Sequence, residues 1–241
     1  MRNYNEQYVE QIERLKKENI QLKKENNNLK NAINCPANPG EQITLDHLIS
    51  ILKNLKYEKK ITNYKIYNNL SLGAPKETHY RQVDHLVITN RGIFVIETKH
   101  WKGDIYYNFS SEDLEKFKLS GLKKYLYDSK TKTYKTFILD SANYNLVFRS
   151  YGHPYDQIMA TTLAIKEKFN FPFVNPIIYF NYQSSYNVFK GNNEKYVSYA
   201  TSKQELSDVL EDKMFKNNKF NRYYTDNDIL QICKEIETSF K

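Results

Sequence analysis

Two apolar runs separated by a short polar turn form the clearest pattern in this chain. Val, Ile and Phe dominate residues 83–88 and 93–96, as is typical of strands in a buried sheet. Between the runs, Thr89-Asn90-Arg91-Gly92 has the length and composition of a hairpin turn. The pattern therefore predicts an antiparallel hairpin in the interior of the protein.

Three charged residues, Asp84, Glu97 and Lys99, interrupt these apolar runs. Charged groups are costly to bury without partners, so we expect them to be paired or functional. If Asn90 and Arg91 are the two loop residues, Asp84 lies opposite Glu97. Glu97 and Lys99 are two residues apart and share one face of their strand. Two carboxylates this close repel each other unless a cation lies between them, and Lys99 or a divalent metal could supply that charge.

Apolar periodicity and capping signals predict the elements around this hairpin. Leu45, Leu48 and Leu52 repeat at helical spacing after Gly40-Glu41, which predicts a helix from there to about residue 55. Further helices are predicted at 111–119, 154–169 and 226–240, and another begins after Ser202. Strands are predicted at 61–72, 104–107, 144–149, 175–181 and 195–199. A second hairpin is predicted at 125–138.

A seven-residue repeat precedes these elements. Its d positions are Tyr8, Leu15, Leu22 and Leu29, and its a positions are Asn5, Ile12, Asn19, Asn26 and Ile33. The repeat predicts one helix over residues 5–34, and Asn at a positions favours a parallel, two-stranded coiled coil. We therefore expect a parallel homodimer through residues 5–33. The alternatives are a solvated charged helix or an arm that packs on the rest of the chain.

The segment Cys35-Pro36-Ala37-Asn38-Pro39-Gly40 ends this helix, because proline cannot continue it. The predicted organisation is a coiled-coil helix at 1–34, a linker at 35–40, an α/β domain at 41–200 with an elaboration at 108–150, and C-terminal helices at 201–241 packed on that domain.

Composition adds a preference for a polyanionic partner. The 241-residue chain carries a net charge of +8, which favours nucleic acid as a partner. The alternative is that the charge only reflects a compositional bias, since Lys, Asn, Ile and Tyr are all abundant. Cys35 and Cys233 are far apart and lack metal-ligand spacing, so no disulfide framework is expected. No apolar run approaches the ~20 residues of a membrane helix, and the polar N-terminus is unlike a secretory signal. We expect a cytoplasmic protein.

Several short motifs occur in a fixed order. They are Gly40-Glu41, Val83-Asp84-His85, Gly92 to Lys99, Trp101-Lys102-Gly103 and Pro154-Tyr155-Asp156-Gln157. In this order the motifs resemble the nuclease-related domain (NERD) family of the PD-(D/E)XK nuclease superfamily, over roughly residues 38–180. The resemblance implies a restriction-endonuclease-like core, in which helices flank a mixed central sheet.

The resemblance also implies a Mg²⁺- or Mn²⁺-dependent endodeoxyribonuclease. In such a site Asp84 and Glu97 hold the metal, together with the backbone carbonyl of Thr98. Lys99 positions or activates the attacking water.

Two further site residues follow from the same resemblance. Glu41 supports the site as a ligand or orients water, and Gln157 contacts the metal water or a phosphate. Taken without the resemblance, Glu41 complements the helix dipole and Gln157 caps its helix or faces solvent.

Two other functions stay open at this point. The chain could be a non-catalytic module for nucleic-acid binding or assembly that retains the nuclease fold, or Asp84, Glu97 and Lys99 could form a structural ion-pair cluster without a metal. Glu41, Asp84, Glu97 and Lys99 are all intact, which favours catalysis. Metal-dependent cleavage of DNA, with Asp84→Ala as the control, discriminates among the three.

Overall fold

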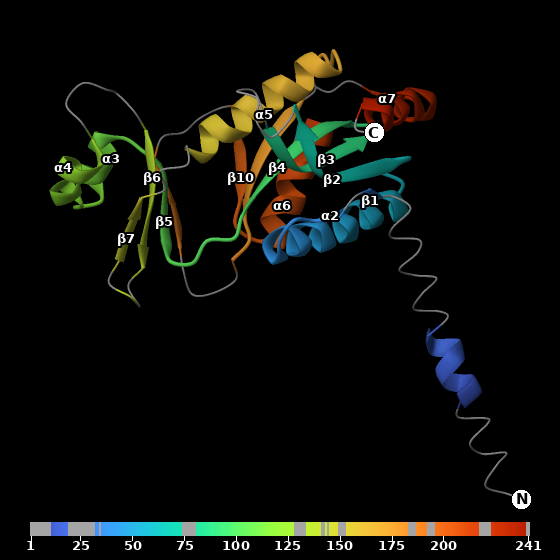
Figure 1. Cartoon of the computed structure of the whole chain (residues 1–241), viewed down its shortest axis with the longest axis horizontal. Coiled ribbons are helices and arrows are strands. Elements are labelled where there is room, and N and C mark those ends of the chain that lie inside the picture. The colour runs from blue at the N-terminus through green and yellow to red at the C-terminus, as the bar shows by residue number, and fades with distance from the viewer. Residues whose placement is uncertain are drawn as a thin grey trace, which may run out of the picture.

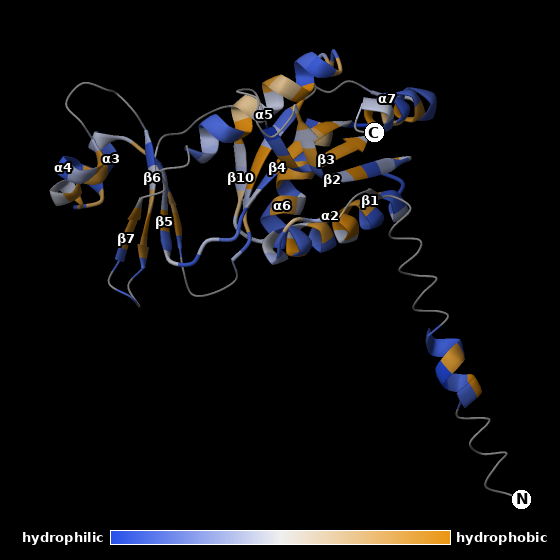
Figure 2. Ribbon diagram, viewed as in Figure 1, coloured by the Kyte–Doolittle hydropathy of each residue, from blue (hydrophilic) through white to orange (hydrophobic). Residues whose placement is uncertain are grey.

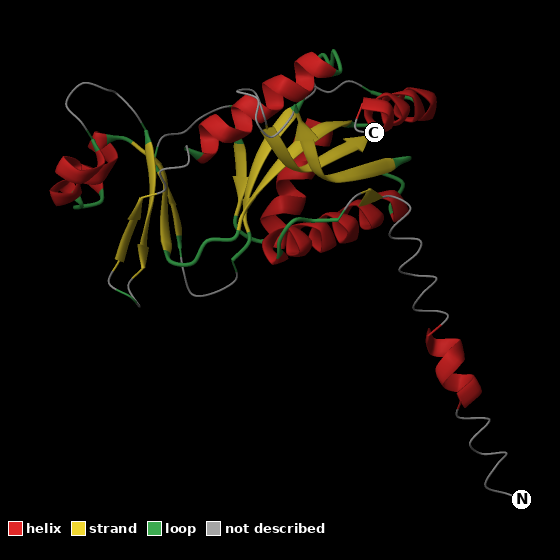
Figure 3. Ribbon diagram, viewed as in Figure 1, coloured by secondary structure: helices red, strands yellow, loops and turns green. Residues whose placement is uncertain are grey.

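The computed structural model describes residues 11–18, 32–33, 35–73, 81–127, 134–140, 143, 145–148, 153–182, 187–191, 196–216 and 223–239. Within these ranges the chain forms two sheets with helices packed around them (Figure 1, Figure 3). None of the helices in these ranges is long and apolar enough to cross a membrane.

The larger sheet has six strands in the order β1-β2-β3-β4-β8-β10. Its strands are β1 (Ala32–Ile33), β2 (Tyr64–Leu72), β3 (Arg81–Thr89), β4 (Gly92–Lys99), β8 (Asn175–Phe180) and β10 (Ser198–Ala200). The β2–β3 and β3–β4 pairs are antiparallel, and the other three pairs are parallel. The predicted mixed central sheet is confirmed.

The central hairpin has the predicted register. Thr89 pairs with Gly92 and Ile88 with Ile93, so Asn90 and Arg91 are the two loop residues. The Thr89 hydroxyl donates to the Gly92 carbonyl at 3.0 Å and accepts from the Arg91 backbone N–H at 3.0 Å. These bonds fix the turn and, through it, every side-chain position along both strands.

Helices cover both faces of this sheet (Figure 1). On one face α2 (Pro39–Tyr57) and α6 (Lys203–Glu211), which continues into the short π-helix η2 (Asp212–Lys216), pack on Val87, Phe94 and Ile96. On the other face α5 (Pro154–Lys168) and α7 (Asp226–Ser239) pack on Leu86, Ile88, Ile93 and Val95. The central strands are therefore apolar on both faces, which explains their nearly continuous hydrophobic sequence, and Figure 2 shows these strands coloured mostly as hydrophobic.

A second, smaller sheet follows β4. Its strand order is β7-β6-β5-β9, with β5 (Asp104–Phe109), β6 (Lys135–Asp140), β7 (Asn145–Phe148) and β9 (Val188–Lys190). Helix α3 (Ser111–Lys116), the 3₁₀ turn η1 (Ser120–Leu122) and α4 (Lys123–Leu126) lie beside it. The predicted elaboration is thus a layer with its own small core, formed by Phe109, Leu114, Leu126 and Phe137.

The predicted hairpin at 125–138 is wrong. Residues 123–126 form helix α4, and β6 pairs with β5 and β7. The helical spacing of Leu119, Leu122 and Leu126 places these side chains on the Phe109–Phe137 core, while Tyr125 is 63% exposed. Leucines at this spacing favour a helix over an alternating strand.

The predicted helix over residues 5–34 is wrong at its C-terminal end. Residues 11–18 are helical, and Ile12 and Leu15 are exposed there. Ala32–Ile33, however, forms β1 in parallel with β2, with Ile33 opposite Tyr67, because the outer edge of β2 offers unpaired backbone groups. Ile33 therefore cannot continue a helix, and the other predicted heptad positions lie outside the described residues.

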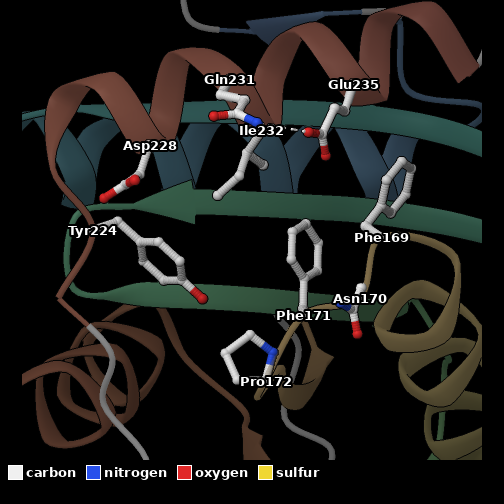
Figure 4. A pocket seen from close by; sticks show the side chains of 9 residues that line it. All are labelled: Phe169, Asn170, Phe171, Pro172, Tyr224, Asp228, Gln231, Ile232 and Glu235. Atoms are coloured by element: carbon white, nitrogen blue, oxygen red, sulfur yellow. Dashed lines mark hydrogen bonds between the residues drawn. The ribbon is translucent and has the colours of Figure 1, made fainter.

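The segment that leads into α7 is hydrogen-bonded to the central hairpin. The backbone N–H of Tyr224 donates to the Asn90 carbonyl in the hairpin turn at 3.0 Å. Between α7 and the turn after α5 lies a hollow of about 170 Å³, into which Phe171, Tyr224 and Ile232 project (Figure 4). These side chains continue the core between α7 and the sheet.

Helix α5 offers a matched test of this packing. Ile165 is fully buried and Leu163 is 49% exposed on the same helix. We expect Ile165→Ala to lower the free energy of unfolding by about 2–5 kcal/mol, since it leaves a cavity, and Leu163→Ala to change it by no more than about 0.5 kcal/mol. Urea denaturation followed by circular dichroism measures both. Equal losses in the two variants would contradict the orientation of α5.

His153, at the N-cap of α5, makes stability depend on pH. Its ring stacks on Tyr107 at 5.9 Å, its Nε2 is buried with no hydrogen-bond partner among the described residues, and burial lowers the pKa of His153 to about 4. Between pH 4 and the ordinary value of 6.5, the unfolded chain therefore binds more protons at His153 than the folded chain does. Linkage then requires the contribution of His153 to stability to be complete above this window and to be lost as the pH falls through it.

We expect the urea midpoint to fall between pH 7 and pH 4, and to fall less in His153→Phe, which keeps the ring but cannot be protonated. Carboxylates that titrate in the same range affect both proteins equally. The comparison therefore isolates His153, and identical pH profiles for wild type and variant would refute its role.

Candidate active site

Asp84 and Glu97 meet where the central hairpin ends. The last paired residues of the β3–β4 ladder are His85 and Ile96, and Asp84 and Glu97 occupy the next position. At this position the side chain of Asp84 takes the place of a backbone partner: its Oδ2 accepts a hydrogen bond from the backbone N–H of Thr98 at 2.8 Å. The structure thus brings together the two carboxylates that the hairpin register predicted.

Lys99 is held between two partners. Its Nζ donates to Glu97 Oε1 at 2.6 Å and to Gln157 Oε1 at 3.0 Å, and it lies 5.5 Å from the centre of the Trp101 ring. Gln157 comes from the first turn of α5, which begins at Pro154. The side chains of Lys99 and Glu97 are 11% and 12% exposed, so the ion pair is largely removed from solvent.

The electrostatic environment favours added positive charge. Burial raises the pKa of Asp84, and the neighbouring charge of Glu97 raises it further, against the opposing effect of the Thr98 N–H. Burial also raises the pKa of Glu41, and its hydrogen bond from Ala37 opposes this shift. Carboxylates in this situation are stabilised in their charged form by a cation.

Glu41 lies near Asp84 and Glu97, but its hydrogen bonds are to other residues. It is 4% exposed, and its carboxylate accepts the Ala37 backbone N–H at 2.6 Å and the Asn38 side-chain amide at 2.5 Å. It influences Asp84 and Glu97 through charge, and no hydrogen bond joins it to either. In this structure Glu41 orders the start of α2.

Helix α2 is fixed against β4 by a small buried network. The Thr98 hydroxyl donates to the Thr44 hydroxyl at 2.9 Å, and the Asn181 side-chain amide donates to Thr44 Oγ1 at 2.8 Å. The side chain of Thr98 therefore points away from Lys99, and its backbone remains beside Asp84. This leaves the backbone carbonyl as the group of Thr98 that the resemblance assigns to a metal.

The oxygens of the two carboxylates suit a hard cation. Asp84 Oδ1 and Glu97 Oε2 have no hydrogen-bond partner among the described residues, and both residues line a pocket of about 510 Å³. Across the described ranges, no group of three or more His, Cys, Asp or Glu side chains is placed to hold a metal ion. Mg²⁺ is commonly held by one or two carboxylates with water completing its shell, so the donor set fits this ion.

The pocket also contains residues that the sequence analysis missed. Arg81 opens β3 and Asp156 lies in the first turn of α5, and both line the pocket with Asp84 and Glu97. Asp156 stands next to Gln157 in a motif already singled out, which was a usable signal. Nothing local marked Arg81, because its role depends on where β3 begins relative to α5.

His85, next to Asp84, has a structural role. It is fully buried, its Nδ1 lies 2.8 Å from Asn68 Oδ1, and burial lowers its pKa to about 3. It points to the α2 face of the sheet, opposite to Asp84, as the alternation of a strand requires.

Comparison with known proteins identifies the family of the chain. The model of the family described as "Nuclease-related domain" (NERD) matches residues 36–181, a span that contains Glu41, Asp84, Glu97, Lys99 and Gln157. No curated protein and no solved structure matches the chain. Because the family model covers more than half of the 241 residues, the chain belongs to the NERD, or nuclease-related domain, family.

Proposed function

We propose that this protein is a metal-dependent nuclease that hydrolyses phosphodiester bonds of DNA, with Mg²⁺ or Mn²⁺ as its cofactor. The observation that carries the proposal is the position of Lys99. Its ammonium is hydrogen-bonded to Glu97 and Gln157 at the pocket that Asp84 also lines. A family match to nuclease-related domains supports the same reaction class.

Each residue has a distinct part in this proposal. Asp84 and Glu97 would hold the cation together with the Thr98 carbonyl, and a cation bound there would stabilise negative charge on the phosphoryl oxygens and acidify water. Gln157 and Glu97 hold Lys99 Nζ in place, so that its remaining proton points to a water or a phosphate oxygen. Lys99 thereby orients the attacking water with little loss of side-chain freedom during the reaction.

The charge of the chain suits the proposed substrate. Lys and Arg number 36 against 28 Asp and Glu, giving a net charge of +8. Two of the basic side chains, Arg81 and Lys99, belong to the site itself. We infer that Arg81 contacts a phosphate next to the scissile one, since guanidinium groups match phosphate oxygens in pairs.

Asp84→Asn and Glu97→Gln should each abolish cleavage of plasmid and linear DNA, because each removes one ligand charge while preserving shape. Lys99→Met should lower the rate by about 10²–10⁴-fold and leave metal binding intact. Glu58→Gln, which changes an exposed carboxylate, is the control. Cleavage is followed on gels with and without Mg²⁺ or Mn²⁺, and circular dichroism confirms folding.

Calorimetry provides the decisive contrary result. If wild-type protein binds neither Mg²⁺ nor Mn²⁺, the metal-dependent mechanism is refuted. If Asp84→Asn still cleaves DNA, Asp84 is not required for the reaction.

We also propose that the N-terminal segment makes the protein a parallel homodimer. Two of its seam positions, Ile12 and Leu15, lie on a described helix and are 50% and 56% exposed. Burying a leucine of this kind contributes about 1.5–3 kcal/mol, and the Asn residues at a positions reduce the total. A dimer would carry two active sites, which would suit cutting both strands of a duplex.

Light scattering tests the dimer. The full chain should have twice the 28.7 kDa mass of one protomer, and a chain lacking residues 1–31, which keeps β1, should be a monomer with unchanged cleavage per site. Leu15→Asn should weaken the dimer in the intact chain. A full-length chain that stays monomeric at high micromolar concentration rules the homodimer out.

A further inference from the structure

A second pocket lies on the other side of β4 from Asp84, beside α2. Its volume is about 440 Å³, and Ile43, His47, His100, Asn181 and Tyr182 line it. None of these residues lines the pocket of Asp84 and Glu97, and only Asn181 was met above, in the network that fixes α2 against β4. We call it the His100 pocket.

The His100 pocket is joined directly to the proposed site. His100 follows Lys99 in the chain, and the Asn181 backbone N–H donates to the Lys99 carbonyl at 3.2 Å. Ile43 and His47 lie on α2, the helix that begins at Glu41 and its neighbours. The two pockets lie on opposite faces of the sheet at the end of β4, so a strand of nucleic acid that places a phosphate at Lys99 would have to continue around this strand end to reach the His100 pocket.

A buried amide fixes the chemistry of His100. Asn181 is fully buried, and its Nδ2 donates to the Gly40 carbonyl at 2.6 Å. Because a carbonyl oxygen only accepts hydrogen bonds, the orientation of the Asn181 amide is settled. Asn181 Oδ1, 2.7 Å from His100 Nδ1, must then accept, so His100 donates from Nδ1. Neutral His100 therefore presents the lone pair of Nε2, for which no partner exists among the described residues.

The remaining walls are flat and aromatic. The Tyr182 and His100 rings meet edge to face with centroids 4.9 Å apart. His47 is held by the Tyr179 hydroxyl, 2.8 Å from its Nδ1, and Ile43 adds an apolar side chain. The pocket combines ring faces for stacking with one fixed hydrogen-bond acceptor.

We propose that the His100 pocket binds one unstacked nucleobase of the substrate, from the nucleotide next to the scissile phosphate. The ring of Tyr182 stacks on the base, and His100 Nε2 accepts an N–H from its edge. No Lys or Arg is among the lining residues, which favours a base over a phosphate as the occupant. The volume of about 440 Å³ lies within the usual range for small-ligand pockets.

This proposal rests on the proposed function and narrows its substrate. A base can enter the pocket only if it leaves a duplex stack or was never in one. The preferred substrate is therefore single-stranded DNA, or a duplex with an unpaired or frayed nucleotide at the cleavage position. A fully paired duplex would have to give up one stacked base pair.

Binding without divalent metal separates this pocket from catalysis. Fluorescence anisotropy measures the affinity of the full chain for a short single-stranded oligodeoxynucleotide and for a series in which one nucleotide at a time is abasic. We expect Tyr182→Ala to weaken binding about five- to a hundredfold and Tyr182→Phe to stay near wild type. Tyr57→Ala, at the far end of α2 and 90% exposed, is the control.

The abasic series supplies the specific signature. One abasic position should weaken binding to wild type and cost nothing further in Tyr182→Ala, because both changes remove the same contact. Ile43→Trp, which fills the pocket without removing a wall, should imitate Tyr182→Ala and remains informative if that variant unfolds.

Additive losses from the abasic position and Tyr182→Ala would overturn the proposal, as would wild-type affinity in both Tyr182→Ala and Ile43→Trp. In either case cleavage that still depends on Asp84 leaves the nuclease function standing. A wild-type chain that binds no nucleic acid at low salt would overturn both proposals together.

Discussion

The candidate site depends on two carboxylates, Asp84 and Glu97, held side by side at the end of a buried hairpin. Such groups repel each other and lose their hydration. The protein offsets this with the Thr98 N–H on Asp84 and the Lys99 ammonium on Glu97. Well-packed apolar residues in place of a buried ion pair are often neutral or stabilising by about 1–4 kcal/mol, so stability alone does not account for these charges. Their presence is better explained by chemistry.

Three elements hold this pair in place: the hairpin turn, α5 and α2. The two-residue turn at Asn90 and Arg91 sets the register that places Asp84 opposite Glu97. Helix α5 supplies Gln157 to Lys99 from one face of the sheet. Helix α2 is bonded through Thr44 to Thr98 from the other face. The site therefore lies where one strand end meets two helix N-termini, and a shift in any of the three would separate its groups.

The sequence predicted this part of the fold well, because its signals are local. Asp84, Glu97 and Lys99 follow from a two-residue turn and the period of two in a strand. Contacts between distant segments were beyond such reasoning: Arg81 joins the pocket through the packing of α5 on β3, and Glu41 turns to Ala37 and Asn38. Ile33 matched a heptad, yet pairing with β2 decided its conformation.

Two glycines of the family motifs show how the pocket walls are brought together. A side chain at Gly40 would place its Cβ 2.4 Å from His100 Cβ, so only glycine lets α2 begin against the residue that follows Lys99. Gly103 has φ of +108°, and a Cβ there would lie 2.6 Å from Ile138 Cγ2 and 3.0 Å from the Leu139 carbonyl oxygen. Glycine adopts this conformation at no steric cost, which allows the chain to pass from β4 to the second sheet with only residues 100–103 between β4 and β5. Gly40 thus lets α2 approach His100, which lines the second pocket, and Gly103 lets the chain turn after Trp101, whose ring lies 5.5 Å from Lys99 Nζ.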